Sequence, residues 1–489
     1  AGSATLGVVI GGSGALAKKG AGVLTLSGAN TYAGGTFIQA GTLVGNSTSL
    51  HGAISNAGTL DFNQAVAGTF TGVIGGTGLV QKDGVGTLTL TGASTYTGAT
   101  SINAGTLQAG AANAFSANSA YTVNAAGTLA VGSYSASIGS LAGTGTVNLG
   151  TGRLTTGGDN TSTTFAGAIG GSGGLTKTGT GVFTLSGVNT YTGGTIVSAG
   201  TLQGTTSSLQ GAITNNATVA FDQTTSGAFT GSLSGTGSVV KANTGTVTFN
   251  AAQTYTGATI VNGGTLQAGI ANMLPTTNAL TVNSGGTFSL NGFNQTIGTL
   301  DGTGSIALGS GTLTTGGDNA TSTFSGTIGG TGGFTKAGTG TLTLGGTNTY
   351  TGLTSVTGGT LKAGSAGAFG ANLFNVGTGS TLDLGGFNIA VNGLSGAGTV
   401  NFGTGVLTVG ADNSNSSFSG LFTGTGGLTK SGTGTFTLGN TASYTGLTTI
   451  NGGTLAAGAA NVFSNASTIV VNAAGTLGLG GFSQSIGSL

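Results

Sequence analysis

Hydrophobic and polar positions alternate in short stretches along the whole chain, and glycine-rich turns separate the stretches. The clearest stretch places threonine between two apolar residues, as in Leu88-Thr89-Leu90. A period of two with a β-branched residue in the polar position predicts a strand with one buried face. A second strand is expected at the Gly-Thr-Leu that follows each copy. The copies are Leu24–Leu26, Leu88–Leu90, Phe183–Leu185, Val247–Phe249, Leu342–Leu344 and Phe436–Leu438.

Both strands belong to one sequence motif that occurs six times with small changes: G-[ST]-G-x-L-x-K-x-G-x-G-x-x-T-L-x-G-x-x-T-Y-x-G-x-T-x-x-x-x-G-T-L. Successive copies of its tyrosine are 64, 95, 64, 95 and 94 residues apart. One short glycine-rich hairpin cannot bury a core without neighbours. A phrase that recurs at this length therefore predicts a stacked array.

The strands recur roughly every 17–25 residues with near-identical turns, which favours the coils of a solenoid over the hairpins of a sandwich. We predict an all-β fold, a right-handed parallel β-solenoid (β-helix) built from six degenerate repeats, because parallel crossovers are right-handed by default. One continuous solenoid is expected over residues 1–489, as a fragment of a longer array, because both ends fall part-way into a unit. Its units are expected near residues 12–75, 76–170, 171–234, 235–329, 330–423 and 424–489.

The composition agrees with this fold and narrows the function. The 489 residues include 107 glycines and one proline without a G-X-Y register, and frequent glycine disfavours helices. Eight lysines, one arginine and eight aspartates leave no basic face for nucleic acid and no polybasic segment for a membrane. Cysteine is absent, and no apolar run is long enough to span a bilayer. We expect no cofactor, no metal ion, no nucleic-acid partner and no membrane insertion by this segment.

Two segments carry a family resemblance. Gly173–Thr195 reads GGLTKTGTGVFTLSGVNTYTGGT, and Gly426–Leu438 reads GGLTKSGTGTFTL. Both resemble the passenger-associated repeats of bacterial autotransporters. The resemblance implies a right-handed parallel β-helix that an outer-membrane β-barrel translocator exports to the surface of a Gram-negative bacterium, where it is displayed or shed. It also implies a role in adhesion, autoaggregation or biofilm structure.

Two residue types of the repeat are candidates for contacts with glycans or surfaces. The lysine occupies a glycine-flanked turn, where we expect a solvated charge that discourages sideways aggregation; a sparse cationic track for acidic polysaccharide is the alternative. The tyrosine is expected to pack at a coil corner, and an exposed ring that stacks on sugars is the alternative. The lysines are Lys18, Lys82, Lys177, Lys241, Lys336 and Lys430. The tyrosines are Tyr32, Tyr96, Tyr191, Tyr255, Tyr350 and Tyr444.

Isolated polar residues give weaker signals. Three Asp-Asn pairs follow glycine-containing turns, and turn formation through local backbone hydrogen bonds is preferred over calcium binding, because one carboxylate per turn is a poor site. The sole histidine, His51, is expected at the surface, and Arg153 is equally isolated. The pairs are Asp159-Asn160, Asp318-Asn319 and Asp412-Asn413.

The expected function is that of an extracellular structural or adhesive rod or fibre of a bacterial surface protein, which mediates adhesion, aggregation or formation of a biofilm matrix. Expected partners are other copies of the chain, joined end to end or laterally, and extracellular glycans or host or abiotic surfaces. An ice- or glycan-binding solenoid module is one alternative, and ice binding is suggested by the pairs Thr87/Thr89 and Thr341/Thr343. A β-helix polysaccharide-degrading enzyme is another, but it would need clustered charges on one face, so no enzyme activity is expected.

Overall fold

The computed structural model describes residues 2–489, and within this range the chain forms short β-strands joined by turns. The strands range from two residues, as in β27 (Leu233–Ser234), to eleven, as in β13 (Ala120–Ala130). Strands one coil apart in the sequence pair in parallel, and this arrangement confirms the predicted parallel β-solenoid. Its right-handed wind stays a prediction. Helix is absent from residues 2–489, so no helical segment there has the length and hydropathy of a membrane span.

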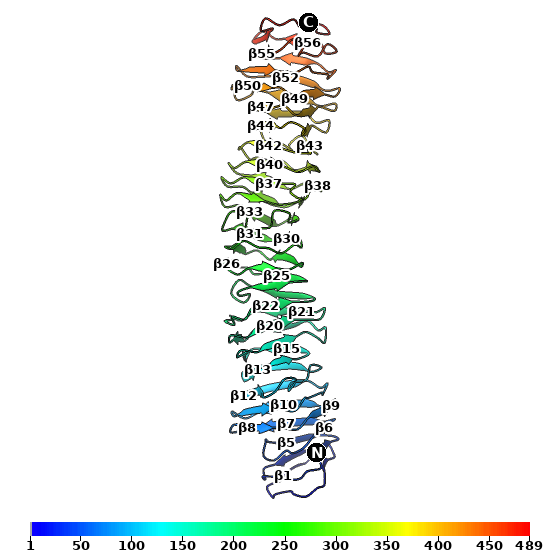
Figure 1. The fold of residues 1–489 in the computed structure, drawn as a ribbon, viewed down its shortest axis with the longest axis vertical. Coiled ribbons are helices and arrows are strands. Elements are labelled where there is room, and N and C mark those ends of the chain that lie inside the picture. The colour runs from blue at the N-terminus through cyan, green and yellow to red at the C-terminus, as the bar shows by residue number, and fades with distance from the viewer. Residues whose placement is uncertain (1) are drawn as a thin grey trace. The chain divides into compact units, whose positions relative to one another are not determined.

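The chain divides into two compact units. Unit 1 comprises the described residues up to Gln223 together with Phe229–Ser238, and unit 2 comprises Thr224–Ala228 and Val239–Leu489. Both consist of parallel coils, and the coils of each unit can be followed by colour in Figure 1. A single solenoid over residues 1–489 with the six unit bounds given above stays a prediction.

The core of unit 1 is built from columns of apolar side chains. One column runs through β11 (Thr87–Leu90), β12 (Thr100–Ala109), β13, β16 (Thr146–Asn148) and β19 (Ala168–Gly170). Each residue of the column is the ladder partner of the next, and none is more than 1% exposed. Burial of side chains of this size contributes about 1.5–3 kcal/mol each. The column consists of Leu88, Leu107, Leu129, Val147 and Ile169.

Unit 2 repeats this construction with other residues. Its matching column runs through β41 (Thr341–Leu344), β43 (Thr360–Ala363), β45 (Thr381–Asp383), β48 (Thr399–Asn401) and β51 (Leu421–Thr423). All of its members are at most 2% exposed. The alternation seen in the sequence therefore places every second residue inside. The column consists of Leu342, Leu361, Leu382, Val400 and Phe422.

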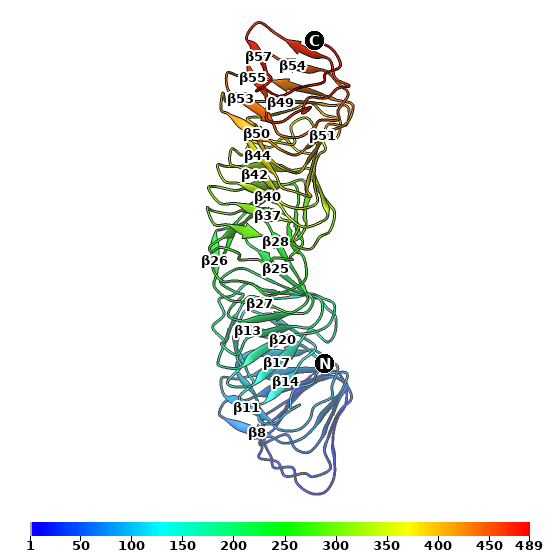
Figure 2. The same ribbon diagram turned by 45° about the horizontal axis from the view of Figure 1, so that its top comes forward.

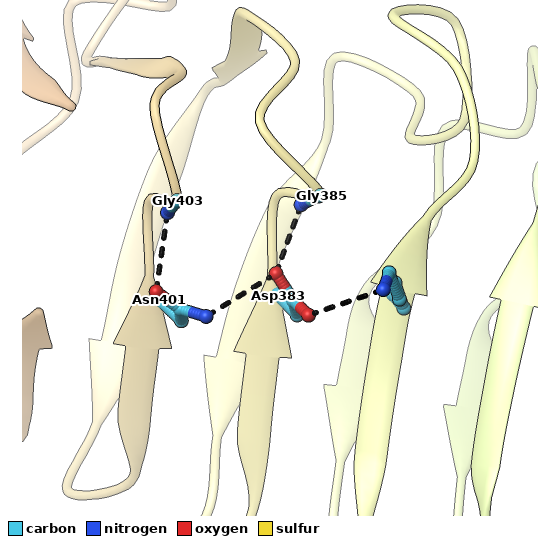
Figure 3. A network of polar contacts seen from close by, with 5 residues as sticks. Asp383, Gly385, Asn401 and Gly403 are labelled. Atoms are coloured by element: carbon cyan, nitrogen blue, oxygen red, sulfur yellow. Dashed lines mark hydrogen bonds and ion pairs between the residues drawn. The ribbon is translucent and has the colours of Figure 1, made fainter. Parts of the chain in front are cut away.

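Polar side chains stack on the outside of the same strands, as Figure 3 shows for three coils of unit 2. Lys362 Nζ lies 3.8 Å from Asp383 Oδ2, and Asn401 Nδ2 donates to Asp383 Oδ1 at 3.5 Å. Asp383 Oδ1 also accepts a hydrogen bond from the amide of Gly385, which starts the next turn. The lysine side chain is 46% exposed, so the ion pair contributes at most about 1 kcal/mol.

Glycine is required where the turns of successive coils approach each other. A Cβ on Gly167 would lie 1.8 Å from the carbonyl oxygen of Gly145, and one on Gly187 would lie 2.1 Å from that of Gly167. No side chain fits at these distances. The glycines of the repeat thus let the backbones of neighbouring coils pack directly at the corners.

Candidate functional site

The repeated lysine is buried at the inner side of a coil corner. Lys82 is the fourth residue of β10 (Leu79–Asp83), and its ammonium group donates to the carbonyls of Asp83 at 2.9 Å, Gly84 at 2.8 Å and Ala104 at 3.0 Å. The first two carbonyls belong to its own turn, and the third belongs to the next coil. An ammonium group has three N–H donors, so all of them are used. Lys82 therefore ties two successive coils together at one corner.

All six lysines make this contact. Each donates to the carbonyls one, two and 22 residues further along the chain, at distances of 2.5–3.3 Å, and none is more than 5% exposed. The residue two positions on has a positive φ in each copy: it is glycine in five copies and Asn243 in the other. This turn directs two carbonyls at one point, where a cation satisfies both. We call this arrangement the lysine clamp.

The clamp corrects the prediction of a solvated turn charge. Because these ammonium groups are buried, they do not face solvent and offer no cationic track to an acidic polysaccharide. Burial lowers the pKa of four of these lysines, since the charged form loses its hydration water. The three carbonyls offset part of this penalty. The corrected residues are Lys18, Lys82, Lys177, Lys241, Lys336 and Lys430.

The repeated tyrosine is buried as well. Tyr350 OH lies 2.7 Å from Oγ1 of Thr354, which begins strand β42 (Thr354–Val356), and the same bond joins tyrosine to the threonine four residues on in every copy. None of the six rings is more than 3% exposed. The alternative of an exposed ring that stacks on sugars is therefore wrong. The burial supports the prediction that the tyrosine packs at a coil corner. The residues are Tyr32, Tyr96, Tyr191, Tyr255, Tyr350 and Tyr444.

Comparison with known proteins agrees with this geometry. Six stretches match the passenger-associated-transport-repeat (PATR) family. Each match begins in the strand that carries the clamp lysine, and it ends in the following Gly-Thr-Leu strand. One repeat thus spans parts of two successive coils, together with the lysine clamp that joins them and the tyrosine. The matched residues are 16–44, 80–109, 175–203, 239–268, 334–363 and 428–457.

The chain therefore contains six copies of the PATR repeat of autotransporter passengers. Among curated proteins it is similar to the adhesin BmaC autotransporter of Brucella suis biovar 1 (strain 1330), with 35% identity over 546 aligned positions. The alignment covers 91% of this chain and 16% of the relative, so the chain spans about a sixth of that protein. No solved structure matches the chain significantly. The six repeats and the similarity to an autotransporter place the chain outside the cell or on the surface of a Gram-negative bacterium.

An asparagine that the sequence reasoning missed also connects coils in three PATR repeats. Asn189 Oδ1 accepts from the amide of Ile169 at 2.9 Å, and its Nδ2 donates to Ser208 O at 2.8 Å. Asn30 and Asn348 make the same pair of contacts. Successive members of this set are 159 residues apart, and this regular spacing was the sequence signal that could have identified them.

Asp61 is a buried carboxyl group that has no counterpart in the second copy. It is the third residue of β7 (Thr59–Asn63), is 8% exposed, and its Oδ1 has no hydrogen-bond partner. The pKa of Asp61 is raised to about 7; burial is the largest cause, Asp83 adds to the rise, and Lys82 opposes it. The same position of β25 (Thr218–Asp222) is Ala220. Comparison of the two copies was the signal that could have singled Asp61 out.

The other polar candidates have structural partners. In the first Asp-Asn pair, Asp159 Oδ1 accepts from the amide of Thr161, and Asn160, with φ of 62°, accepts from Thr180 of the next coil. The turn-forming interpretation is confirmed for these pairs, since Asp318 and Asp412 also accept from the amide two residues on, and Asn319 and Asn413 also accept from the next coil. Within residues 2–489, no three His, Cys, Asp or Glu side chains are grouped to hold a metal ion.

His51 and Arg153 also contact neighbouring coils. The His51 ring lies edge-on to Tyr32, with centroids 5.7 Å apart, and is half-buried rather than free at the surface. The Arg153 guanidinium donates to Leu175 O at 3.0 Å and to Gly193 O at 3.2 Å. Arg153 thus bridges to the two coils that follow its own.

Only one threonine of each pair continues from coil to coil: Thr87 aligns with Thr106, and Thr341 aligns with Thr360. Thr89 lies between Thr69 and Gln108 in its ladder. Thr343 lies between Thr323 and Lys362. An ice-binding face needs two unbroken threonine files on one plane. The files of Thr89 and Thr343 are broken one coil later, so each pair begins one continuous threonine file and not the two that an ice-binding face needs.

Proposed function

We propose that this chain is a surface-displayed solenoid segment of an autotransporter adhesin, which attaches the bacterium to surfaces or to other cells. The similarity to an adhesin within the PATR family carries this proposal. The internal organisation supports it, because the repeated residues serve coil-to-coil contacts and leave the outer rows of side chains free to vary.

The physical basis of the role is stability that accumulates coil by coil. Each coil adds buried apolar residues, and each PATR repeat adds a lysine clamp and a tyrosine–threonine bond. The chain contains no cysteine, so disulfides do not contribute. Such a segment can remain folded outside the cell without cofactors, and it can present its outer residues at a distance from the membrane.

The finer proposals concern the binding partners of the segment. Aggregation and formation of biofilm matrix would follow if copies on different cells associate, end to end or laterally. Attachment to glycans or to host or abiotic surfaces would follow if the outer face binds them directly. An outer face in which serine, threonine and asparagine are common and a few leucines are exposed supports contacts that depend little on charge.

Display on a non-adherent bacterium tests the proposal. The 489-residue chain would be fused between a signal sequence and an autotransporter translocator, with an unrelated passenger of equal expression as the control. Attachment to host-cell layers and to glass, and settling of the culture, would be measured at several salt concentrations. We expect attachment or settling above the control, with weak salt dependence. Equal values for both passengers in all three assays would refute the adhesive role.

A further inference from the structure

One outer groove of unit 2 is suited to an uncharged, elongated ligand. It crosses five successive strands: β42, β44 (Leu373–Val376), β47 (Gly393–Gly396), β50 (Ser416–Phe418) and β53 (Thr435–Leu438). These strands follow one another along unit 2 in Figures 1 and 2. Two adjoining hollows, of about 320 and 420 Å³, share the residues Asn415, Ser416 and Ser417. With strands about 4.8 Å apart, the groove is about 19 Å long.

The groove has an apolar end and a hydroxyl-rich end. Leu353 and Leu373 lie side by side at one end and are 47% and 48% exposed, which is unusual beside a core where leucine is buried. Gly393 follows them in the same row, and because it has no side chain the row dips there. Beyond the dip, the lining consists of Asn415, Ser416, Ser417, Thr435 and Thr437.

The polar end has unused hydrogen-bonding capacity. Asn415 Oδ1 accepts from the amide of Thr435 at 2.7 Å, so its Nδ2 group is left over. Among residues 2–489, the hydroxyls of Ser417 and Thr437 have no protein partner. None of the residues that line either hollow is charged. A ligand is therefore selected by apolar contact and by neutral hydrogen bonds, and not by charge.

We propose that this groove binds a neutral polysaccharide, with sugar rings lying on Leu353 and Leu373 and sugar hydroxyls bonding to the Asn415–Ser417 and Thr435–Thr437 segments. A hexose combines an apolar C–H face with a rim of hydroxyls, and a polysaccharide repeats both along its length. The order of leucines, dip and hydroxyls along one line matches that combination. This inference rests on the proposed adhesive function and names the class of its ligand.

Binding of soluble tetrasaccharides to the full 489-residue chain tests the groove. The probes are β-1,4-linked glucose and N-acetylglucosamine tetramers, with an oligogalacturonate tetramer as the acidic comparison, followed by saturation-transfer NMR and calorimetry. We expect at least one neutral tetramer to bind, with a constant that does not change between low and high salt, and the acidic tetramer to bind more weakly. Failure of both neutral tetramers to bind, or preference for the acidic one, would overturn the proposal.

Two variants locate the site, and one serves as the control. Leu373→Ser removes an exposed apolar contact, and Ser417→Gln narrows the hydroxyl end at an exposed position, so neither touches the core. Each is expected to weaken binding roughly tenfold. Leu421→Ser changes a leucine that is 45% exposed outside the groove, and it should bind as the parent does. If Leu373→Ser and Ser417→Gln bind the tetramer with the same affinity as Leu421→Ser and the parent, the site is refuted.

The display assay separates this proposal from the broader function. If cells that display the Leu373→Ser and Ser417→Gln variants attach as well as the parent, the segment is adhesive but the groove is not the adhesive site. If the unchanged chain gives no attachment while its groove binds a neutral tetramer, the groove proposal stands and the adhesive function fails.

Discussion

The buried carboxyl of Asp61 makes the stability of its coil depend on pH. Because its pKa is raised from 3.8 to about 7, the folded state holds the proton more tightly than the unfolded state does. The stabilising contribution is complete below pH 3.8 and is lost as the pH rises through 7. Replacement by asparagine removes the titration but keeps the size of the side chain, and Ala220 shows that the same place in the second copy needs no carboxyl group.

The shift sets the size of the effect. A change of about three pKa units at about 1.4 kcal/mol per unit gives roughly 4 kcal/mol, which is an upper bound because the Asp61 side chain keeps some exposure to solvent. At pH 8 we therefore expect the coil of β7 and β10 to be more stable in Asp61→Asn than in the parent, by up to this amount. At pH 4 the two proteins should be nearly equal, since both then carry a neutral group.

Native-state hydrogen exchange is the suitable assay, because long repeat arrays do not unfold as one cooperative unit. Opening free energies of amides in β7 and β10 would be compared at pH 4 and pH 8. Asp83→Asn serves as a second variant and should recover only part of the gain, because burial is the largest cause of the shift. Equal protection of parent and Asp61→Asn at both pH values would refute the reasoning.

Three further predictions concern the PATR repeat itself. Lys336→Met leaves three carbonyls without their lysine donor. We expect the opening free energy of the two joined coils, measured by hydrogen exchange, to fall by about 2–4 kcal/mol. An unchanged value would show that the clamp contributes nothing. Tyr350→Phe should cost about 1 kcal/mol, and combination with Thr354→Val should cost less than the sum, because no buried hydroxyl is then left alone; an additive double-mutant cycle would contradict the bond. Burial raises the pKa of Tyr444 to about 12 against an ordinary 10.0, so its stabilising effect is complete below pH 10 and lost as the pH rises through 12. Phenolate absorbance should then appear in step with the loss of β-sheet circular dichroism, and ionisation without unfolding would contradict this.

The fold could be predicted because alternation and glycine spacing are local signals. The Thr-Leu and Gly-Thr-Leu strands lie where the pattern placed them, and their leucines form the buried columns. The same alternation also predicts that the lysine faces inward. Leu175 and Lys177 are two residues apart in β20 (Gly174–Lys177), so they share a face, and that face is buried. The charge of lysine suggested the opposite, and it was the less reliable signal here.

The groove could not be predicted, because its members are brought together only by register. Leu353, Leu373 and Asn415 are 20 and 42 residues apart, and coil lengths vary enough that the sequence does not show which residues stack. The burial of Asp61 was hidden for a similar reason. It follows an inward leucine directly and so occupies an outward position, and only its neighbours in β5 (Thr42–Gly45) and β10 determine how well it is covered.

A periodic sequence does not give this protein a periodic surface. In unit 2, the strand of Lys336 from one PATR repeat and the Thr-Leu strand β53 from the next belong to a single ladder, β40 (Phe334–Lys336) through β53. Different parts of the repeat therefore occupy the same outer row, because consecutive repeats begin on different sides of the coil. The middle of the groove, from Leu373 to Ser417, lies where that ladder passes through coils between two repeats, and its ends at Leu353 and Thr435 lie within the repeats. The repeats thus supply coil-to-coil contacts that are buried and constant, while the intervening coils can acquire a binding surface without disturbing them. A search for adhesive residues in this family should therefore begin in the coils between the repeats.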